Sequence, residues 1–439
     1  MTRTLGEQLI EGWAAGAHVK FKSDKAKAKY QASTKRILDA IRLKVPDRVP
    51  VVNAAVQRFA LDYSGVTMYE AMTDFDKAFD AQIKFYRDFD LDGWAGADFI
   101  FPLDMFASLD WQRVRWPGHG VPLNATFQFV EKEYMPVEEI DEFLDDPSNW
   151  YIHKYLPRLS PVLAPFASLP PIHDTIMFYQ GLAEFESAFT DERWNDTLKA
   201  LQRGGKALAD WFAYLARLDQ EVSGELGIPH FLGAFTQVPF DVVSLFFRGW
   251  TGSVLDMYRR PDKLFKLMDK VLPWVTDYAV RNAEAYGHPI VELYIYKGAD
   301  VFMSEEQFKT FYWPTLKAVI MALLEKGLIP WIWTQGTYDR HLKYFNELPR
   351  ASCFVHLEAG TDIFKAKEVI GHNLCIEGNV PNSLLATGTP DQVREYCKKL
   401  IDICGKGGGY MMDFSALLDE AKPENLHAMI DFTKEYGKY

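Results

Sequence analysis

The feature that most constrains the fold is an alternation, in the second half of the chain, between short apolar runs and longer helical stretches. The apolar runs read as strands near Ile290–Tyr296, Ile329–Thr334, Ser352–Leu357, Leu374–Gly378 and Gly409–Met412, with helices such as Glu305–Lys326 between them. Strands that alternate with helices favour a parallel β-sheet over an all-α bundle. The sequence therefore predicts an α/β protein.

The first half of the chain is less regular. Residues 1–45 are rich in charge and are expected to form a helical extension, followed by a strand at Val49–Ala55 after the turn at Pro46 and Asp47. Between residues 102 and about 175, aromatic and proline-rich segments interrupt the pattern. Long structured loops in compact domains are often functional. We expect this stretch to be an elaborated loop region that covers one end of the sheet.

Composition excludes several classes of function. The chain has 439 residues, 48% of them hydrophobic, and a formal net charge of −12. It can bury a large core but lacks the basic face that nucleic-acid-binding domains usually carry. No run of about 18 uncharged apolar residues suggests a membrane span, and the first residues, MTRTLGEQLIEGW, lack the apolar core of a signal peptide. We expect a soluble, cytoplasmic protein without nucleic-acid or membrane partners.

Three segments carry a resemblance to a known family. They are KVPDRVPV at Lys44–Val51, SEEQFKTFYWPTLKAVI at Ser304–Ile320 and the tail from Gly378 to Tyr439. In order and character they resemble the uroporphyrinogen decarboxylase superfamily, whose barrels host tetrapyrrole decarboxylases and corrinoid-dependent methyltransferases. All three belong to the scaffold, so the activity must be inferred from loop positions.

The resemblance implies a particular domain organisation. A single (β/α)8 TIM-like barrel would occupy residues 46–439, preceded by the helical extension at 1–45 and interrupted by the insertion at about 102–175. In such a barrel, the chemistry is concentrated at the carboxyl ends of the strands.

Strand alternation predicts which side chains share a face there. Several strands end in a polar group on the same side, and these groups would converge near one rim: Glu292, Gln335, His356, Glu358, Glu377 and Asp413. Carboxylates and an imidazole can bind a metal or perform acid–base catalysis. We predict Glu292, His356 and Asp413 as metal ligands and Glu358 and Glu377 as catalytic groups. The alternative is that the carboxylates form ordinary ion pairs.

The zinc-dependent branch of the superfamily moves methyl groups between a corrinoid and a thiol. It holds zinc with a His-x-Cys pair and a late cysteine. At the matching strand this chain has residues Trp333 to Gly336, and near the late cysteine it has Met411 to Asp413. The usual thiolate site is therefore absent. Carboxylate and histidine ligands can still hold zinc beside an ether or hydroxyl oxygen.

The decarboxylase branch binds its substrate, which carries eight carboxylates, with a pair of arginines. After Pro50 this chain reads VVNAAVQRFA, which leaves only Arg58, displaced by one residue. The branch's aspartate matches Asp98 in ADFIFP, which we keep as a catalytic candidate, although a helix cap or an ion pair would explain it equally. Without the arginines, porphyrin decarboxylation is disfavoured.

What remains resembles corrinoid-linked methyltransferases that demethylate small donors. The resemblance implies a substrate-side methyltransferase that moves a methyl group from a small, methoxylated aromatic or similar donor to a corrinoid (cobalamin) or a corrinoid protein. Tyr296 and Lys297 are candidates to supply a proton or a cation to the leaving group. Candidate substrate contacts are Trp333, Gln335, Tyr338, Thr236, Gln237 and Asn379.

Two other interpretations stay open. The chain could be a decarboxylase of another carboxylate, or a non-catalytic barrel that binds a corrinoid protein. Polar groups that meet in one cavity would favour an enzyme, whereas scattered groups would favour a binding role. The resemblance also implies a homodimer.

Overall fold

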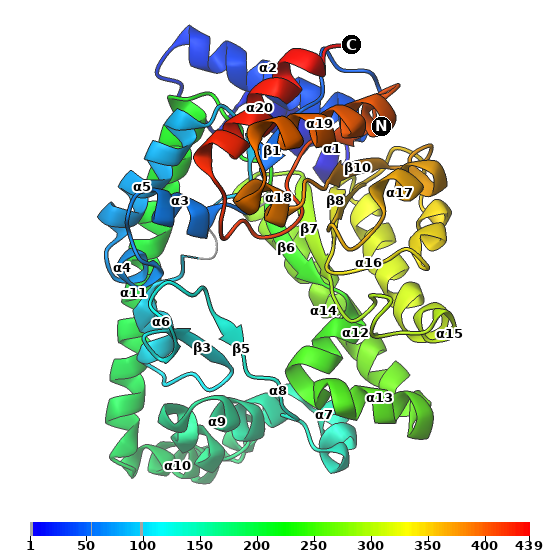
Figure 1. The fold of residues 1–439 in the computed structure, drawn as a ribbon. Coiled ribbons are helices and arrows are strands. Elements are labelled where there is room, and N and C mark those ends of the chain that lie inside the picture. The colour runs from blue at the N-terminus through cyan, green and yellow to red at the C-terminus, as the bar shows by residue number, and fades with distance from the viewer. Residues whose placement is uncertain (1–2, 54, 97–99) are drawn as a thin grey trace.

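The computed structural model describes residues 3–53, 55–96 and 100–439, and a parallel sheet lies at the centre of the fold (Figure 1). The sheet has six strands in the order β11-β10-β9-β8-β7-β6, and all neighbours pair in parallel. The strands are β6 (Ala234–Gln237), β7 (Ile290–Ile295), β8 (Ile329–Thr334), β9 (Phe354–Leu357), β10 (Cys375–Gly378) and β11 (Tyr410–Met411). Each of the five predicted apolar runs contains one of these strands, so the α/β prediction is confirmed.

A second parallel sheet has two strands, β1 (Val52–Asn53) and β2 (Gly93–Trp94). Single bridges join it to its neighbours on both sides, Val51 to Met412 and Trp94 to His230. This arrangement is consistent with a TIM-like barrel, but no continuous ladder closes a barrel among the described residues.

The first strand is shorter than the predicted Val49–Ala55. Met412 donates its backbone N–H to the carbonyl of Pro50, and Val52 donates to the carbonyl of Met412. Pro50 has no N–H of its own to extend the ladder in the other direction. The regular pairing therefore starts only at Val52.

Helices connect the strands of the second half and cover the outside of the sheet (Figure 1). They are α12 (Pro239–Val242), η6 (Val243–Arg248), α13 (Gly249–Arg259), α14 (Pro261–Tyr286), α15 (Glu305–Gln307), η7 (Phe308–Tyr312), α16 (Trp313–Glu325), η8 (Leu342–Glu347), α17 (Ile363–Ile370), α18 (Asn382–Thr387), α19 (Pro390–Leu400), η9 (Ile401–Gly405) and α20 (Pro423–Tyr436). The predicted helix Glu305–Lys326 forms as the pieces α15, η7 and α16, because Pro314 has no N–H to continue one regular α-helix.

The first half of the chain is mostly helical around β1 and β2. Its helices are α1 (Leu5–Ala15), α2 (Asp24–Ile41), α3 (Gln57–Tyr63), α4 (Met68–Thr73), α5 (Phe75–Asp88) and the long α11 (Arg193–Gly224). The predicted extension at 1–45 thus contains two helices.

The elaborated region between these helices consists of short elements. They are α6 (Leu103–Ala107), β3 (Val114–Pro117), β4 (Gly120–Val121), β5 (Gln128–Phe129), η1 (Val137–Glu139), α7 (Ile140–Asp145), α8 (Pro147–Trp150), η2 (Tyr151–Tyr155), α9 (Leu156–Leu159), η3 (Pro161–Ser168), η4 (Ile172–Ile176), α10 (Phe178–Ser187) and η5 (Ala188–Thr190). The irregular stretch therefore continues some 15 residues past the predicted boundary, up to α11.

Strand alternation divides the core into two clusters. Val291, Leu293 and Ile332 face the helices and belong to the larger cluster. Their neighbours along the strands, such as Trp331 and Trp333, face the interior with residues of α1 and α2. No helix in the described part of the chain has both the length and the apolar character needed to cross a bilayer.

Candidate metal centre

Three polar side chains meet at the carboxyl ends of adjacent strands. They are His356 on β9, Glu377 on β10 and Asp413, two residues beyond the end of β11. One potential ligand atom from each lies within 4.8 Å of the other two, and all three side chains are buried. The parallel register places His356 directly beside Glu377. These residues come from two adjacent strands and from the segment that follows a third, so the fold itself assembles the cluster.

The orientation of His356 is fixed by its outer ring nitrogen. Nε2 lies 3.2 Å from the backbone carbonyl of Ser415, and a carbonyl can only accept, so Nε2 carries the hydrogen. The other nitrogen, Nδ1, therefore directs a lone pair toward the carboxylates when the ring is neutral. Histidines that ligate metals usually donate their second ring N–H to a carbonyl or carboxylate in this way.

The three groups do not satisfy one another. His356 Nδ1 lies 3.8 Å from Glu377 Oε1 and 3.8 Å from Asp413 Oδ2, which is beyond hydrogen-bonding distance. Both oxygens of Glu377 and Nδ1 of His356 are buried without a hydrogen-bond partner among the described residues. A buried charge without a partner is costly. A positive group bound between these side chains would remove that cost.

The distances between the potential ligand atoms fit a bound metal ion. Zinc lies about 2.0–2.2 Å from nitrogen and oxygen ligands, so ligand atoms around one ion stand roughly 3–4 Å apart. The 3.8 Å separations fall in this range. Catalytic zinc sites commonly have three protein ligands and one open position. The donor set of one imidazole and two carboxylates fits such a site.

Glu358 lies two residues after His356, just beyond the end of β9. Its Oε2 accepts a hydrogen bond of 2.7 Å from the backbone N–H of Gly336. Burial raises the pKa of Glu358, while the Gly336 N–H and the nearby His356 oppose the rise. A carboxyl group that retains its proton more readily than usual can act as a general acid.

Aromatic rings line the sheet beside the cluster. The centroid of Trp333 is 4.3 Å from that of His356 and 5.0 Å from that of Tyr294, and the ring of Tyr294 is 5.8 Å from Phe235. Trp333 is buried, whereas Phe235 is exposed. The rings form a continuous aromatic wall from His356 toward solvent.

A second polar cluster lies beyond β6 and β7. Asp241 accepts hydrogen bonds from the backbone N–H groups of Tyr296 and Lys297 and from the hydroxyl of Tyr312, at 3.1, 2.9 and 2.5 Å. Burial raises the pKa of Asp241 to about 6. Asp241 therefore holds the loop after β7 in place.

The buried side chain of Lys297 contacts the elaborated region, α13 and the segment after β7. Its ammonium lies 3.4 Å from Glu131 Oε2 and about 5 Å from the ring centroids of Trp250, Tyr296 and Phe302. These contacts join Lys297 to the segments around Glu131 and Trp250 rather than to His356. Burial raises the pKa of Tyr296.

Three predicted substrate contacts are engaged elsewhere. The hydroxyl of Thr236 donates to the carbonyl of Val275 on α14, because alternation turns this residue of β6 toward the helices. The buried hydroxyl of Tyr338 donates to the carbonyl of Ile295. Neither side chain is directed into the interior of the sheet.

The third of these residues, Asn379, lies two residues beyond Glu377, where a regular strand would direct its side chain to the same face. Its amide instead donates to the carbonyls of Glu358 and Thr361, and its Oδ1 accepts from Tyr396. Gly378 leaves the extended conformation with φ +110°, which redirects the following side chain.

The remaining candidates lie around the cluster or outside the described residues. Glu292 shares the interior face but pairs with Trp331, two residues before the level of His356, and is not part of the three-residue cluster. Gln237 and Gln335 are half-buried near the ends of β6 and β8. Asp98 lies outside the described residues.

Sequence reasoning missed the role of Ser415. Its carbonyl orients His356, and its hydroxyl accepts from the backbone N–H of Ala359. The acceptor is a main-chain atom, so no side-chain signal could have revealed it.

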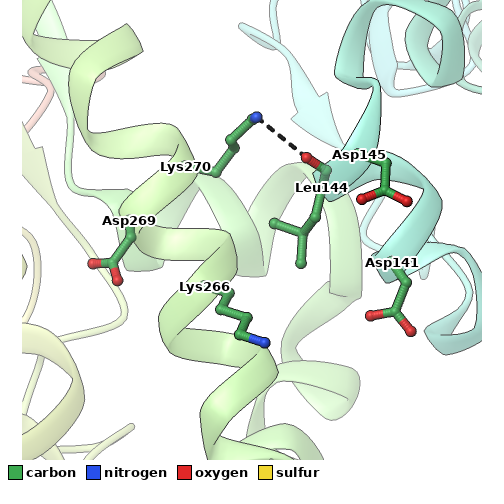
Figure 2. Close-up of a pocket in the computed structure, with 6 residues that line it drawn as sticks. All are labelled: Asp141, Leu144, Asp145, Lys266, Asp269 and Lys270. Atoms are coloured by element: carbon green, nitrogen blue, oxygen red, sulfur yellow. Dashed lines mark hydrogen bonds between the residues drawn. The ribbon is translucent and has the colours of Figure 1, made fainter.

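Figure 2 shows a hollow between α7 and α14 on the outside of the molecule. It is lined by Asp141, Leu144, Asp145, Lys266, Asp269 and Lys270. Lys270 donates to the carbonyl of Leu144 at 3.2 Å, and most of the charged groups are exposed. Exposed charges of both signs explain this hollow as a solvated surface, so the His356 cluster remains the candidate site.

The fold and the site together define a class. The chain is an α/β protein whose parallel strands carry a histidine–carboxylate cluster at their carboxyl ends, the place where proteins with such sheets bind ligands. Comparison with known proteins gives the family. Residues 181–436, more than half of the chain, match the family "Uroporphyrinogen decarboxylase (URO-D)", and the chain belongs to it. The predicted superfamily is thus confirmed.

Individual relatives are distant. The uroporphyrinogen decarboxylase of Chlorobium phaeovibrioides is 26% identical over 185 residues, which cover 41% of this chain and 51% of the relative. That of Chloroherpeton thalassium is 26% identical over 190 residues, or 42% and 52% of the two chains. The chain spans about half the length of the curated relatives it matches.

A solved structure extends the likeness to nearly the whole chain. A methyltransferase from Methanosarcina mazei aligns with a TM-score of 0.57 over 92% of this chain and 98% of that one, at 14% sequence identity. At this identity the likeness concerns the fold.

Proposed function

We propose that this protein is a substrate-side methyltransferase that moves a methyl group from a small methoxylated donor to a corrinoid. His356, Glu377 and Asp413 would hold a catalytic zinc ion. The observation that carries the proposal is the buried carboxylate of Glu377, whose two oxygens have no hydrogen-bond partner among the described residues. Such a group indicates a cation-binding site.

The chemistry divides between the metal and the chain. A bound zinc ion would supply a Lewis acid that makes an ether oxygen a better leaving group. In the overall reaction, the carbon–oxygen bond of the donor breaks, the methyl group passes to the reduced corrinoid, and the departing oxygen gains a proton. Glu358, whose pKa is raised by burial, is placed beside His356 to provide that proton.

The aromatic wall supports a flat donor. Tyr294 and Trp333 stack with an interplanar angle of 20°, and Phe235 extends the wall to solvent. Aromatic rings prefer offset-stacked or edge-to-face partners, so a methoxylated ring could lie against Tyr294 and Phe235 with its ether oxygen toward His356.

Membership of the family supports a corrinoid as the methyl acceptor. One solved structure of similar fold carries the name methyltransferase. The decarboxylase alternative draws support from the names of the curated relatives. Against it, Arg58 is engaged by carboxylates, with Nε 3.5 Å from Asp62 and Nη1 3.6 Å from Asp419. An arginine that is already paired with carboxylates of the protein is less able to bind the carboxylates of a substrate.

The first test combines metal analysis with a methyl-transfer assay. The purified protein is analysed for zinc by mass spectrometry and mixed with cob(I)alamin and a panel of methoxylated aromatics, and absorbance reports methylcobalamin. We expect one zinc per chain and donor-dependent conversion. Glu377→Gln should lose both, whereas Glu395→Gln, at an exposed glutamate of α19, should keep both.

The outcomes separate the alternatives. Zinc without conversion, even with a corrinoid protein supplied, would refute methyl transfer and leave the metal centre for another reaction. Conversion that persists in Glu377→Gln would remove the cluster from the mechanism.

A further inference from the structure

Two arginines of the elaborated region share one face of a short strand pair. β3 pairs antiparallel with β5, and the carbonyl of Arg113 continues the pairing by accepting from the backbone N–H of Val130. Along β3, Val114 and Trp116 are buried, so alternation turns Arg113 and Arg115 to the opposite face. In Figure 1 these strands lie between α6 and α8.

The guanidinium of Arg113 is held against aromatic rings of two elements. Its central carbon lies 4.0 Å from the ring centroid of Phe246 on η6 and 5.5 Å from that of Tyr134. Its Nη1 donates to the hydroxyl of Tyr155 at 3.4 Å. That bond uses a single N–H, and a stacked guanidinium presents its other donors at its edge. Arg113 is therefore oriented before any ligand binds.

Two further cations lie beside Arg113. A glycine leaves room for the stem of Arg115, because a Cβ atom at residue 120 would come within 2.6 Å of Arg115 Cδ. The ammonium of Lys132 lies 5.0 Å from the ring centroid of Tyr134. Burial raises the pKa of Tyr134, and the positive charges of Arg113 and Arg115 oppose the rise. The three cations thus gather around one tyrosine.

No carboxylate of the protein balances these charges. Within the described part of the chain, none of the three cations forms an ion pair, and the carboxylates that follow β5 are bound elsewhere, in the pairs Glu131–Lys297, Glu133–Arg248 and Glu139–Arg158. Like charges held close together repel one another. In a chain with a net charge of −12, this local excess of positive charge is the arrangement that a bound anion would stabilise.

We propose that Arg113 and Arg115, with Lys132 beside them, bind the carboxylate group of an aromatic acid. The planar fork of a guanidinium matches a carboxylate with two parallel hydrogen bonds. The rings of Tyr134 and Phe246 give the site apolar surroundings, which suit an organic acid better than a strongly hydrated inorganic ion.

The site is a feature of this chain's own elaborated region. Its three cations all precede residue 181, where the match to the family begins. Phe246 follows β6 through α12 and η6, so the site lies at the carboxyl end of the sheet, as the candidate metal centre does. Binding of an aromatic acid here does not require that the protein transfers a methyl group.

Calorimetric titration of the full chain with benzoate measures binding without any reaction. We expect saturable binding of benzoate and none of benzyl alcohol, which has the ring but no charge. Arg113→Leu keeps an apolar side chain over Phe246 but loses the donors, and Arg115→Leu loses the second fork. Each should weaken benzoate binding by a factor of about 10 to 100. The matched control Arg281→Leu, at an exposed arginine of α14, should bind as the wild type does.

A further variant separates the hydrogen bonds from the fold. Arg113→Lys keeps the charge without the planar fork, so it should bind benzoate more weakly than the wild type at an unchanged unfolding temperature. The zinc content should be equal in all these variants, because none of the substituted residues belongs to the metal cluster. A wild type that does not bind benzoate would overturn the proposal. So would binding that survives the loss of both arginines, or binding of inorganic phosphate in place of benzoate.

Discussion

At the scale of single residues, the buried carboxylate of Glu377 is the strongest indication of a cation-binding site. A buried carboxylate with no hydrogen-bond partner among the described residues is rare in folded proteins and needs a physical reason. Glu377 reaches this position because β10 continues to alternate up to Gly378, so its side chain faces the interior beside His356. A metal ion between the two would remove the cost of burial.

This account predicts opposite effects of one substitution with and without metal. Glu377→Met removes the unpaired carboxylate at similar volume, so the metal-free variant should be more stable than the metal-free wild type by roughly 1–3 kcal/mol. Zinc at about 100 times its dissociation constant should stabilise the wild type by about 2.7 kcal/mol and leave the variant unchanged. Denaturant titrations with chelator and with zinc measure both effects. A wild type indifferent to zinc would contradict the assignment.

Glu358 predicts a pH dependence of turnover. Because burial raises its pKa, the protonated acid persists above the ordinary glutamate range of about 4.3. Turnover should therefore fall as the pH rises through this raised pKa. Glu358→Gln should lower the rate about 10²–10⁴-fold and abolish that limb of the profile. Glu368→Gln, at an exposed residue of α17, should keep the wild-type profile; an unchanged profile in Glu358→Gln would assign the proton to another group.

At the scale of elements, the polar loops after β6 and β7 are held together by Asp241. The folded carboxyl group has a pKa of about 6 because it is buried, whereas an unfolded aspartate has a pKa of about 3.9. The groups that face it are the Tyr312 hydroxyl, the backbone of Tyr296 and Lys297, and the Lys297 ammonium. Between these two pH values the folded chain holds a proton that the unfolded chain has lost.

The sign of the linkage follows from this difference. The contribution of Asp241 to the free energy of unfolding should decline as the pH rises from about 4 to about 6, by roughly 3 kcal/mol in total. Asp241→Asn should remove this decline, whereas Asp277→Asn, at an exposed residue of α14, should retain it. Urea titrations at several pH values measure the slope. Equal slopes in wild type and Asp241→Asn would show that the carboxyl group ionises normally.

The elements also show what the sequence could and could not predict. The five apolar runs predicted five strands because buried parallel strands read as continuous apolar segments. Alternation then placed His356 and Glu377 on one face. It failed at Asn379, where the positive φ of Gly378 ends the extended conformation. Thr236 was a candidate from the family resemblance, and its hydroxyl instead donates to the carbonyl of Val275 on α14. Backbone conformation at strand ends is set by tertiary contacts that a single sequence does not reveal.

At the scale of the whole molecule, the N-terminal helices are part of the core. Trp13, Tyr30 and Ile37 pack in one cluster with Ile290 and Ile329, the first residues of β7 and β8. The helices thus close the amino end of the sheet, opposite the candidate metal centre. Residues 1–45 read as a separate extension because their charge pattern is that of an exposed helix; the residues that pack inward are few and widely spaced.

A buried ion pair ties α2 to the sheet. Arg36 Nη1 lies 2.7 Å from Asp92 Oδ1, Arg48 lies 2.6 Å from the other oxygen, and the Val51 N–H donates to the same carboxylate. Burial of Asp92 opposes its ionisation, but the guanidinium groups of Arg48 and Arg36 still lower its pKa. The pair therefore stabilises the fold at neutral pH and weakens only as the pH falls below the ordinary aspartate range of about 3.9.

If α2 belongs to the core, its disruption must act on the entire chain. Arg36→Ala leaves the buried Asp92 with one guanidinium and should cost on the order of 3 kcal/mol. Calorimetry should show this as a lower temperature of a single transition, because the helices and the sheet share one apolar cluster. Lys35→Ala, which breaks an exposed pair with Asp39 on the same helix, should change the transition little. A separate early transition in Arg36→Ala, with the main one unmoved, would instead make residues 1–45 an independent unit.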